Sequence, residues 1–288
     1  MRVELNKISK RFDQTQALDN VSLSFGGHKI YGLLGNNGAG KSTLLNIITG
    51  RYLADSGELT LNDEQLVDND KALGQIYLLS EKNYYPESMK VKEAFKWASY
   101  FYPNFDMKLA NELSERFELP QKKKIENLST GYGSIFKIVM AFSSGAEILL
   151  LDEPVLGLDA LHRDMFYKLL LEHYSNNPCT IVISTHLISE VANLVEHCFI
   201  IKKGKLIKDA PCEELLNAGY TVSGGSSLVD EYLHGKTVLS VNTLGGLKTA
   251  FLSGEMPTQS QLPQGLELGK ANLQEYFIHL MGGEGHNE

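Results

Sequence analysis

A glycine-rich segment with one lysine lies between an apolar run and a stretch with helical apolar spacing, at Gly35-Asn36-Asn37-Gly38-Ala39-Gly40-Lys41-Ser42. It fits the pattern G-x-x-x-x-G-K-[ST], whose glycines let successive backbone N–H groups surround phosphate oxygens. Because it joins an expected strand to an expected helix over residues 42–48, we interpret it as a nucleoside triphosphate loop rather than an ordinary glycine turn. Lys41 is expected to reach the β- and γ-phosphates and Ser42 to bind Mg²⁺. The candidate nucleotide-binding residues are Gly35, Asn36, Asn37, Gly38, Ala39, Gly40, Lys41, Ser42 and Thr43.

Two adjacent carboxylates, Asp152 and Glu153, follow the apolar run Ile148–Leu151. The carboxyl ends of buried parallel strands are where an α/β sheet presents its ligand groups. We therefore expect Asp152 to hold Mg²⁺, directly or through water, and Glu153 to polarise the water that attacks the terminal phosphate. Alone, an Asp-Glu pair is more often a solvated turn. Its combination with the phosphate loop favours the catalytic interpretation.

A histidine, His186, ends a further apolar run, Ile181–Ile183, after Ser184 and Thr185. If this run is a strand of the same sheet, the imidazole lies at the same edge as the carboxylates and can donate a hydrogen bond to the γ-phosphate. A lone histidine is more often structural, so this assignment depends on the neighbouring motifs. Glu153 and His186 are thus the candidate catalytic residues.

Two kinds of apolar pattern predict the strands that must position these residues. Continuous apolar runs are typical of strands buried on both faces of a parallel sheet. They occupy residues 30–34, 148–151 and 181–183. Runs that alternate apolar and polar residues are typical of antiparallel strands. They occupy residues 3–5, 21–25 and 59–61. The sequence therefore predicts an α/β fold with a mostly parallel core sheet and an antiparallel β subdomain.

Helical apolar spacing predicts an inserted helical subdomain at about residues 82–130, with helices over 91–102 and 107–119. A further helix is expected over residues 160–174, with Asp159 as its N-cap. In the sequence, the first two helices lie between the phosphate loop and the Asp152-Glu153 pair, and the third follows that pair.

The C-terminal region has a weaker pattern. Ser223–Ser227 is interpreted as a loop, and a strand at 237–241 and a closing helix at 273–281 predict a small α+β extension. The expected organisation is a main domain over residues 1–210 and an accessory subdomain over 211–288.

Composition argues against several classes of protein. The formal net charge is -8, and the one compact basic run, Lys122–Lys124, is too short to track a phosphate backbone, so we expect no nucleic acid partner. No stretch approaches the roughly 18 apolar residues of a membrane-spanning helix, and Met1–Lys10 lacks the apolar segment of a signal peptide, which predicts a cytoplasmic chain. The cysteines are too widely spaced for a disulfide framework or a zinc site, and are expected to be reduced.

The segment Leu128-Ser129-Thr130-Gly131-Tyr132 distinguishes between classes of phosphate-loop protein. It resembles LSGGQ, the signature of the ATP-binding cassette (ABC) transporter family, and it precedes Asp152 by an expected helix over 134–142, as in that family. The whole motif set over about residues 3–209 resembles the ATPase subunit of ABC transporters. The resemblance implies the P-loop NTPase fold with a RecA-like core, ATP and Mg²⁺ as cofactors, and ATP hydrolysis coupled to transport.

The resemblance also implies a dimer, because in that family the signature of one subunit closes over ATP held by the phosphate loop of another. A second ABC ATPase subunit, identical or different, is thus an expected partner, and Ser129 and Gly131 are expected to bind its ATP. Phe12 corresponds to the aromatic residue that stacks on adenine, Glu81 to a metal-linked glutamine, and His186 to the switch histidine. The alternative for the signature segment is a polar helix N-terminus without a ligand.

Three departures from the family pattern concern the hydrolytic step. Glu81 adds negative charge at a metal-binding position, Thr130 and Tyr132 replace a glycine and the glutamine of the signature, and Leu156 replaces a small residue. We therefore expect slow hydrolysis, or hydrolysis that depends on a partner. These variants and the extended C-terminal region resemble bacterial drug-export and bacteriocin-immunity ATPases, which implies an exporter.

The leading hypothesis is therefore an ATPase that powers a membrane ABC transporter through ATP-driven dimerisation. Its partners would be transmembrane permease subunits, and it would be peripheral on the inner face of the cell membrane. The segment Tyr84-Tyr85-Pro86 is a candidate docking site for a permease, although a packed loop is the alternative. A nucleotide-gated regulatory module and a non-transport ABC ATPase acting on DNA or the ribosome are the alternative functions. The latter class generally carries a coiled-coil insert or two cassettes, and this sequence has neither.

Overall fold

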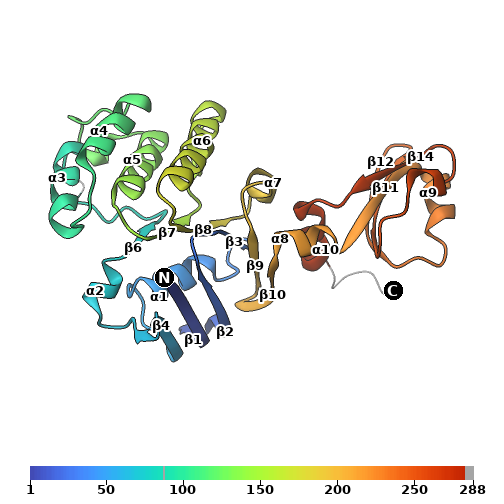
Figure 1. The fold of residues 1–288 in the computed structure, drawn as a ribbon, viewed down its shortest axis with the longest axis horizontal. Coiled ribbons are helices and arrows are strands. Elements are labelled where there is room, and N and C mark those ends of the chain that lie inside the picture. Colours follow the sequence, from blue (N-terminus) through green and yellow to red (C-terminus); the bar gives the residue numbers. More distant parts are fainter. Residues whose placement is uncertain (87, 283–288) are drawn as a thin grey trace. The chain divides into compact units, whose positions relative to one another are not determined.

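The computed structural model describes residues 1–86 and 88–282 and divides into two compact units (Figure 1). The first unit comprises residues 1–186 together with 201–207, and the second comprises residues 187–200 and the chain from 208 onward. The boundary falls within strands β9 (His197–Lys202) and β10 (Lys205–Pro211). The domain division at residue 210 stays a prediction.

The core of the first unit is a six-stranded sheet in the order β10-β9-β3-β8-β7-β6. Its central strands are β3 (Ile30–Leu34), β8 (Thr180–Thr185), β7 (Ile148–Asp152) and β6 (Ile76–Leu79). These four strands pair in parallel, and every residue in them is buried. Burial on both faces explains their continuous apolar sequences, and the predicted mostly parallel core sheet is confirmed.

A second, antiparallel sheet in the order β2-β1-β4-β5 completes the N-terminal part. Its strands are β1 (Arg2–Phe12), β2 (Thr15–Gly26), β4 (Ser56–Leu61) and β5 (Glu64–Gln65). Val3 lies opposite both Phe25 and Leu61, and all three side chains are buried. The apolar residues of the alternating pattern therefore form the buried face of this sheet.

The helices of the first unit include a group formed by α3, α4 and α5 (Figure 1). The helices are α1 (Lys41–Ile48), α2 (Asp70–Leu73), α3 (Val91–Phe101), α4 (Met107–Arg116), a 3₁₀ turn at Ile125–Asn127, α5 (Thr130–Ser143) and α6 (Ala160–Asn176). Phe95 of α3 stacks on Phe136 of α5, with 6.3 Å between ring centroids. Helix α4 ends before the predicted residue 119 because Glu118 adopts a left-handed backbone, with φ of 53°.

The second unit contains a four-stranded antiparallel sheet in the order β12-β13-β11-β14. Its strands are β11 (Gly219–Gly225), β12 (Val238–Leu244), β13 (Leu247–Ser253) and β14 (Leu266–Lys270). The helices of this unit are α7 (Ile188–Val191), α8 (Cys212–Leu216), α9 (Ser226–Leu233), a 3₁₀ turn at Gln259–Gln261, and α10 (Leu273–Gly282). Val229 of α9 packs with Val222, Ala250 and Leu252 of the sheet in a buried cluster.

The prediction of a loop at residues 223–227 is wrong. Residues 223–225 continue β11, and residues 226 and 227 begin α9. Gly224 serves strand packing, because a Cβ atom on it would lie 2.7 Å from the backbone oxygen of Gly265. Glycine in a strand interior marks such a close approach of a neighbouring backbone.

None of the helices within residues 1–86 and 88–282 combines the length and apolar character that crossing a bilayer requires. Cys179, Cys198 and Cys212 are all buried and carry free thiols.

Candidate nucleotide-hydrolysing site

The glycine-rich loop connects β3 to α1 by a backbone that only small residues allow. Gly38 and Gly40 have φ of 77° and 109°, in the left-handed region. Asn36, Asn37 and Gly38 are exposed, whereas Ala39 is buried and its amide donates to the Asn36 carbonyl oxygen at 3.1 Å. Open loop amides at the N-terminus of α1 can therefore face an anion.

The loop lysine is held in place by its own loop. Lys41 is 5% exposed, and its Nζ donates to the Gly35 carbonyl oxygen at 2.7 Å. Burial lowers the pKa of Lys41, and the carboxylates of Glu153 and Asp152 oppose that shift. An ammonium group buried at the mouth of an amide-lined loop is placed to bind phosphate.

The carboxylate of Glu153 is surrounded by three side chains, one from the segment after β3 and two from the end of β8. Its Oε1 is 3.6 Å from Lys41 Nζ and 3.0 Å from His186 Nδ1, and its Oε2 accepts a hydrogen bond from the Thr185 hydroxyl at 3.2 Å. The backbone of Glu153 is itself strained, with φ of 47°, and its N–H donates to the Ser184 carbonyl oxygen at 2.8 Å. The structure therefore brings Lys41, Glu153 and His186 together.

Asp152 lies one residue earlier, at the buried end of β7, opposite Ser184. The Ser184 hydroxyl donates to its carboxylate at 2.8 Å. Burial raises the pKa of Asp152, and hydrogen bonds from the Ser42 and Ser184 hydroxyls lower it. Ser42 is exposed and so presents its oxygen at the loop mouth. A serine hydroxyl beside a carboxylate is a hard-oxygen pair that fits Mg²⁺.

No group of three or more His, Cys, Asp or Glu side chains that would form a protein-only metal site occurs in the described part of the chain. A magnesium ion at Ser42 and Asp152 would thus need further ligands, which nucleotide oxygens and water can supply. This is the usual way in which proteins hold Mg²⁺ at a phosphate site.

The signature segment forms the N-terminus of α5. Ser129 is the N-cap, and its hydroxyl oxygen accepts the Tyr132 amide hydrogen at 3.3 Å. Gly131 lies close to the loop after β7, since a Cβ atom there would be 3.2 Å from the Gly157 carbonyl oxygen. The Ser134 hydroxyl donates to the Leu156 carbonyl oxygen at 2.6 Å. The N-terminal part of α5 is thus joined to the loop after β7, which begins with Glu153.

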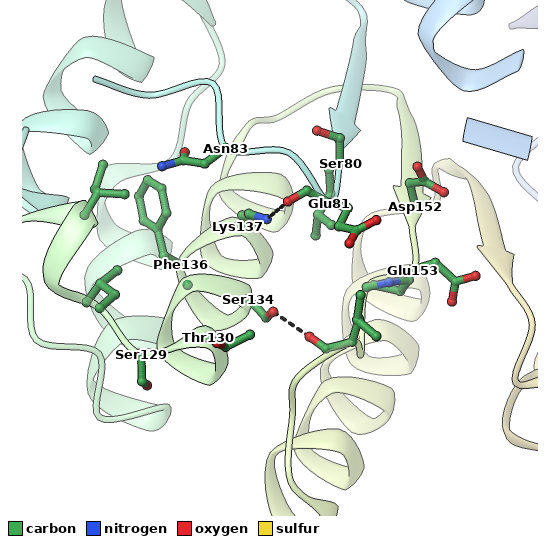
Figure 2. Close-up of a pocket in the computed structure, with 16 residues that line it drawn as sticks. Ser80, Glu81, Asn83, Ser129, Thr130, Ser134, Phe136, Lys137, Asp152 and Glu153 are labelled. Atoms are coloured by element: carbon green, nitrogen blue, oxygen red, sulfur yellow. Dashed lines mark hydrogen bonds between the residues drawn. The ribbon is translucent and has the colours of Figure 1, made fainter. Parts of the chain in front are cut away.

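A cavity of about 340 Å³ lies between the loop after β6, helix α5 and the loop after β7 (Figure 2). Glu81, Asp152 and Glu153 line it on one side, and Ser129 and Lys137 contribute from α5. Lys137 Nζ donates to the backbone carbonyl oxygen of Glu81. Burial lowers the pKa of Lys137, and the carboxylate of Glu81 opposes that shift.

Phe12 is the predicted residue that lies outside these contacts. It ends β1, is 40% exposed, and packs edge-on against Tyr52 with 5.4 Å between ring centroids. Lys10 Nζ also lies over the ring, 5.4 Å from its centroid, and the role of Phe12 in adenine binding stays a prediction.

Sequence reasoning missed Ser134 and Lys137, and it assigned no role to Thr185. Lys137 did carry a signal, because it is the charged residue within the apolar run Ile135–Phe142. A lysine that interrupts the buried stripe of a helix normally has a partner for its amine.

The tight approach at Gly40 gives a testable prediction. A Cβ atom on Gly40 would lie 2.5 Å from the Ala17 carbonyl oxygen, whereas one on Gly38 would meet nothing within 4 Å. Both glycines have positive φ, so alanine strains the backbone at either position. We expect Gly40→Ala to lower the free energy of unfolding by about 1–3 kcal/mol more than Gly38→Ala, measured by urea denaturation. Equal stabilities would contradict the close approach of β2.

Comparisons with known proteins agree with this geometry. The family model described as ABC transporter matches residues 18–156. YtrB, an ABC transporter ATP-binding protein of Bacillus subtilis, is 30% identical over 213 residues, which cover 74% of this chain and 73% of YtrB. CysA of Chlorella vulgaris, a probable sulfate/thiosulfate import ATP-binding protein, is 30% identical over 225 residues, covering 75% of this chain and 93% of CysA.

Among solved structures, a bacterial ABC transporter cassette in dimeric form has a TM-score of 0.65 and 23% sequence identity, over 73% of this chain and 98% of that one. That likeness supports the fold. The family model, the relatives and the juxtaposed loop, carboxylates and signature segment lead to one conclusion: the chain belongs to the ABC transporter family and is one of its ATPase subunits.

Proposed function

We propose that this ATPase binds MgATP at residues 35–43 and hydrolyses it with Glu153 as the group that polarises the attacking water. The main support for this proposal is the position of the Glu153 carboxylate, 3.6 Å from Lys41 Nζ and 3.0 Å from His186 Nδ1. Because Lys41 would bind the terminal phosphates, a base at Glu153 would lie within reach of the water that attacks them. His186 would donate to the γ-phosphate and so keep the water and phosphate aligned.

Mg²⁺ would be bound by Ser42 and Asp152, and Glu81 would lie at the same metal site. The ion would supply positive charge that neutralises the negative charge developing on the phosphate during transfer. Asp152 and Glu81 both line the cavity described above, which supports their assignment to one site.

The working unit in this proposal is a dimer that shares two ATP molecules. Ser129 and Gly131 lie at the N-terminus of α5, where backbone amides and the helix dipole favour an anion. That anion would be the γ-phosphate held by the partner subunit's loop. The dimeric form of the similar cassette supports this arrangement.

The proposed partners are transmembrane permease subunits, on the inner face of the cell membrane, and the proposed direction is export. CysA, named for import, matches at the same 30% identity as YtrB, whose name gives no direction, so the names of these relatives do not support export. Export rests on the variant signature Leu128–Tyr132 and on the additional C-terminal unit.

Affinity purification of the chain from detergent-solubilised membranes, followed by mass spectrometry, tests the partners. The expected result is one or two proteins with several spanning helices, retained in the presence of ATP. A permease that co-purifies with an extracellular substrate-binding protein would contradict export. Recovery of ribosomal proteins or DNA-repair factors in place of a permease would contradict the transport function.

The two tyrosines of the candidate docking segment, Tyr84 and Tyr85, have different environments. The Tyr85 hydroxyl is 3.0 Å from that of Tyr77, its ring packs on Phe136 at 5.0 Å, and burial raises its pKa to about 12. Tyr84 is 51% exposed, and its ring lies under the Arg51 guanidinium at 4.2 Å. Tyr85 is therefore a packing residue, and Tyr84 is the better candidate for permease contact.

We expect Tyr84→Ser to reduce recovery of the permease by roughly tenfold, because an exposed aromatic side chain is a frequent anchor of interfaces. Leu244→Ser, which changes an 84% exposed side chain of the second unit, serves as the control. Quantitative mass spectrometry of both purifications gives the comparison. Unchanged recovery with Tyr84→Ser would exclude this residue from the docking surface.

A further inference from the structure

The cavity beside the carboxylates has an unusual balance of charge. Of its lining residues, all within the described part of the chain, Glu81, Asp152 and Glu153 are acidic and Lys137 alone is cationic. ATP would bring several more negative charges to this place. A cation among these lining residues therefore affects the electrostatic energy of the loaded site.

Lys137 contacts the segment that carries one of those carboxylates. Its Nζ donates to the Glu81 carbonyl oxygen, so it fixes the position of the loop directly after β6 (Figure 2). Lys137 lies three residues after Ser134 on α5, and Ser134 donates to the Leu156 carbonyl oxygen at 2.6 Å. Residues three apart lie on the same face of a helix. Side chains on one face of α5 therefore bind both the loop after β6, which carries Glu81, and the loop after β7, which begins with Glu153.

We propose that Lys137 is a positioning residue for hydrolysis, which anchors the Glu81 loop to the signature helix and balances the Glu81 carboxylate. This inference rests on the proposed function of the same site. Glu81 adds a third carboxylate to the lining of the cavity, and the ammonium group of Lys137, which lies against the Glu81 backbone, offsets that charge. The pair Glu81–Lys137 keeps the loop neutral on balance while its backbone stays tied to α5.

Loss of the amine has two effects on the transition state and little on ATP binding. The charge of the Glu81 carboxylate is no longer offset, and the loop after β6 loses its anchor to α5. The grip on ATP is retained, because Lys41 and the loop amides belong to a different segment, between β3 and α1. The effect therefore falls on kcat rather than on KM.

The test measures phosphate release by the purified full chain as a function of ATP concentration. Lys137→Met keeps most of the side-chain volume without the charge, and should lower kcat about tenfold with KM for ATP within about twofold. Lys137→Arg should retain most of the wild-type kcat, because it keeps the charge and the donors. Lys108→Met is the matched control: Lys108 is an exposed lysine of α4 paired with Glu112 at 3.5 Å, and this change should have no effect.

The role of charge balance is isolated by a double-mutant cycle. In the Glu81→Gln background there is no carboxylate to balance, so Lys137→Met should lower kcat only about two- to threefold. A full tenfold loss in that background would refute charge balance, and unchanged kcat for Lys137→Met in the wild-type background would refute the inference as a whole. Thermal unfolding of each variant, expected within a few degrees of the wild type, shows that the effect is not a loss of folded protein.

These outcomes are separable from failure of the proposed function. A wild-type chain that binds ATP without releasing phosphate, alone or with its permease, overturns the hydrolytic proposal and with it this inference. An active wild type with an equally active Lys137→Met variant overturns only the role of Lys137.

Discussion

Glu153→Gln is expected to retain ATP binding while phosphate release falls by about 10²–10⁴-fold, since an amide cannot accept a proton from the attacking water. The substituted side chain has the same size and can still hydrogen bond to Thr185, whose hydroxyl lies 3.2 Å from the Glu153 carboxylate. Because ATP stays intact, the shared dimer should accumulate. Size-exclusion chromatography with and without ATP, combined with a phosphate-release assay, measures both effects.

Glu147→Gln provides the control for that experiment. Glu147 is an exposed carboxylate immediately before β7, so its change removes the same charge from the same strand at the opposite end. It should release phosphate at close to the wild-type rate. Turnover by Glu153→Gln at the wild-type rate would contradict the role of Glu153 in activating water.

Lys41→Ala is expected to weaken ATP binding by about 100-fold or more, because a buried charged donor to phosphate cannot be replaced by water at the same position. The ammonium group also donates to the Gly35 carbonyl oxygen at 2.7 Å, so its loss relaxes the loop that forms the anion site. Isothermal titration calorimetry with ATP and Mg²⁺ measures the dissociation constant directly.

Lys29→Ala removes an exposed lysine from the residue before β3 and should leave the ATP dissociation constant within about twofold of the wild type. Circular dichroism of Lys41→Ala, with helix content unchanged, separates a loss of affinity from unfolding. Affinity retained by Lys41→Ala would place the phosphates elsewhere than at this loop.

The local elements of the site were predictable because each depends on a few contiguous residues. The phosphate loop needs a strand, glycines and a helix in immediate succession, and residues 30–48 encode all three. Asp152 and Glu153 follow a run whose burial on both faces is visible as unbroken hydrophobicity. Asp159 accepts the His162 amide hydrogen at 2.9 Å, as its N-cap position predicted. Helix ends were less accurate, because they depend on single backbone conformations such as that of Glu118.

The C-terminal unit was harder to predict because its strands are only partly buried and so lack the continuous apolar runs of the core strands. The glycines of residues 223–225 were interpreted as a loop, although they continue β11 beside the closely packed β14. Propensity alone does not reveal that a neighbouring backbone requires glycine.

By itself, the sequence determined the family, the mostly parallel core sheet and the candidate residues for phosphate, metal and base, because these depend on motifs and periodicities that local backbone chemistry enforces. The tertiary structure decided which side chains meet. Sheet order places Thr185 and His186 against Glu153, packing half-buries Tyr85 and leaves Tyr84 exposed, and the fold of α5 joins Lys137 to Glu81. Thr185 and His186 lie 32 and 33 positions from Glu153 in the sequence, and Lys137 lies 56 positions from Glu81. Only the packed chain fixes distances over such separations.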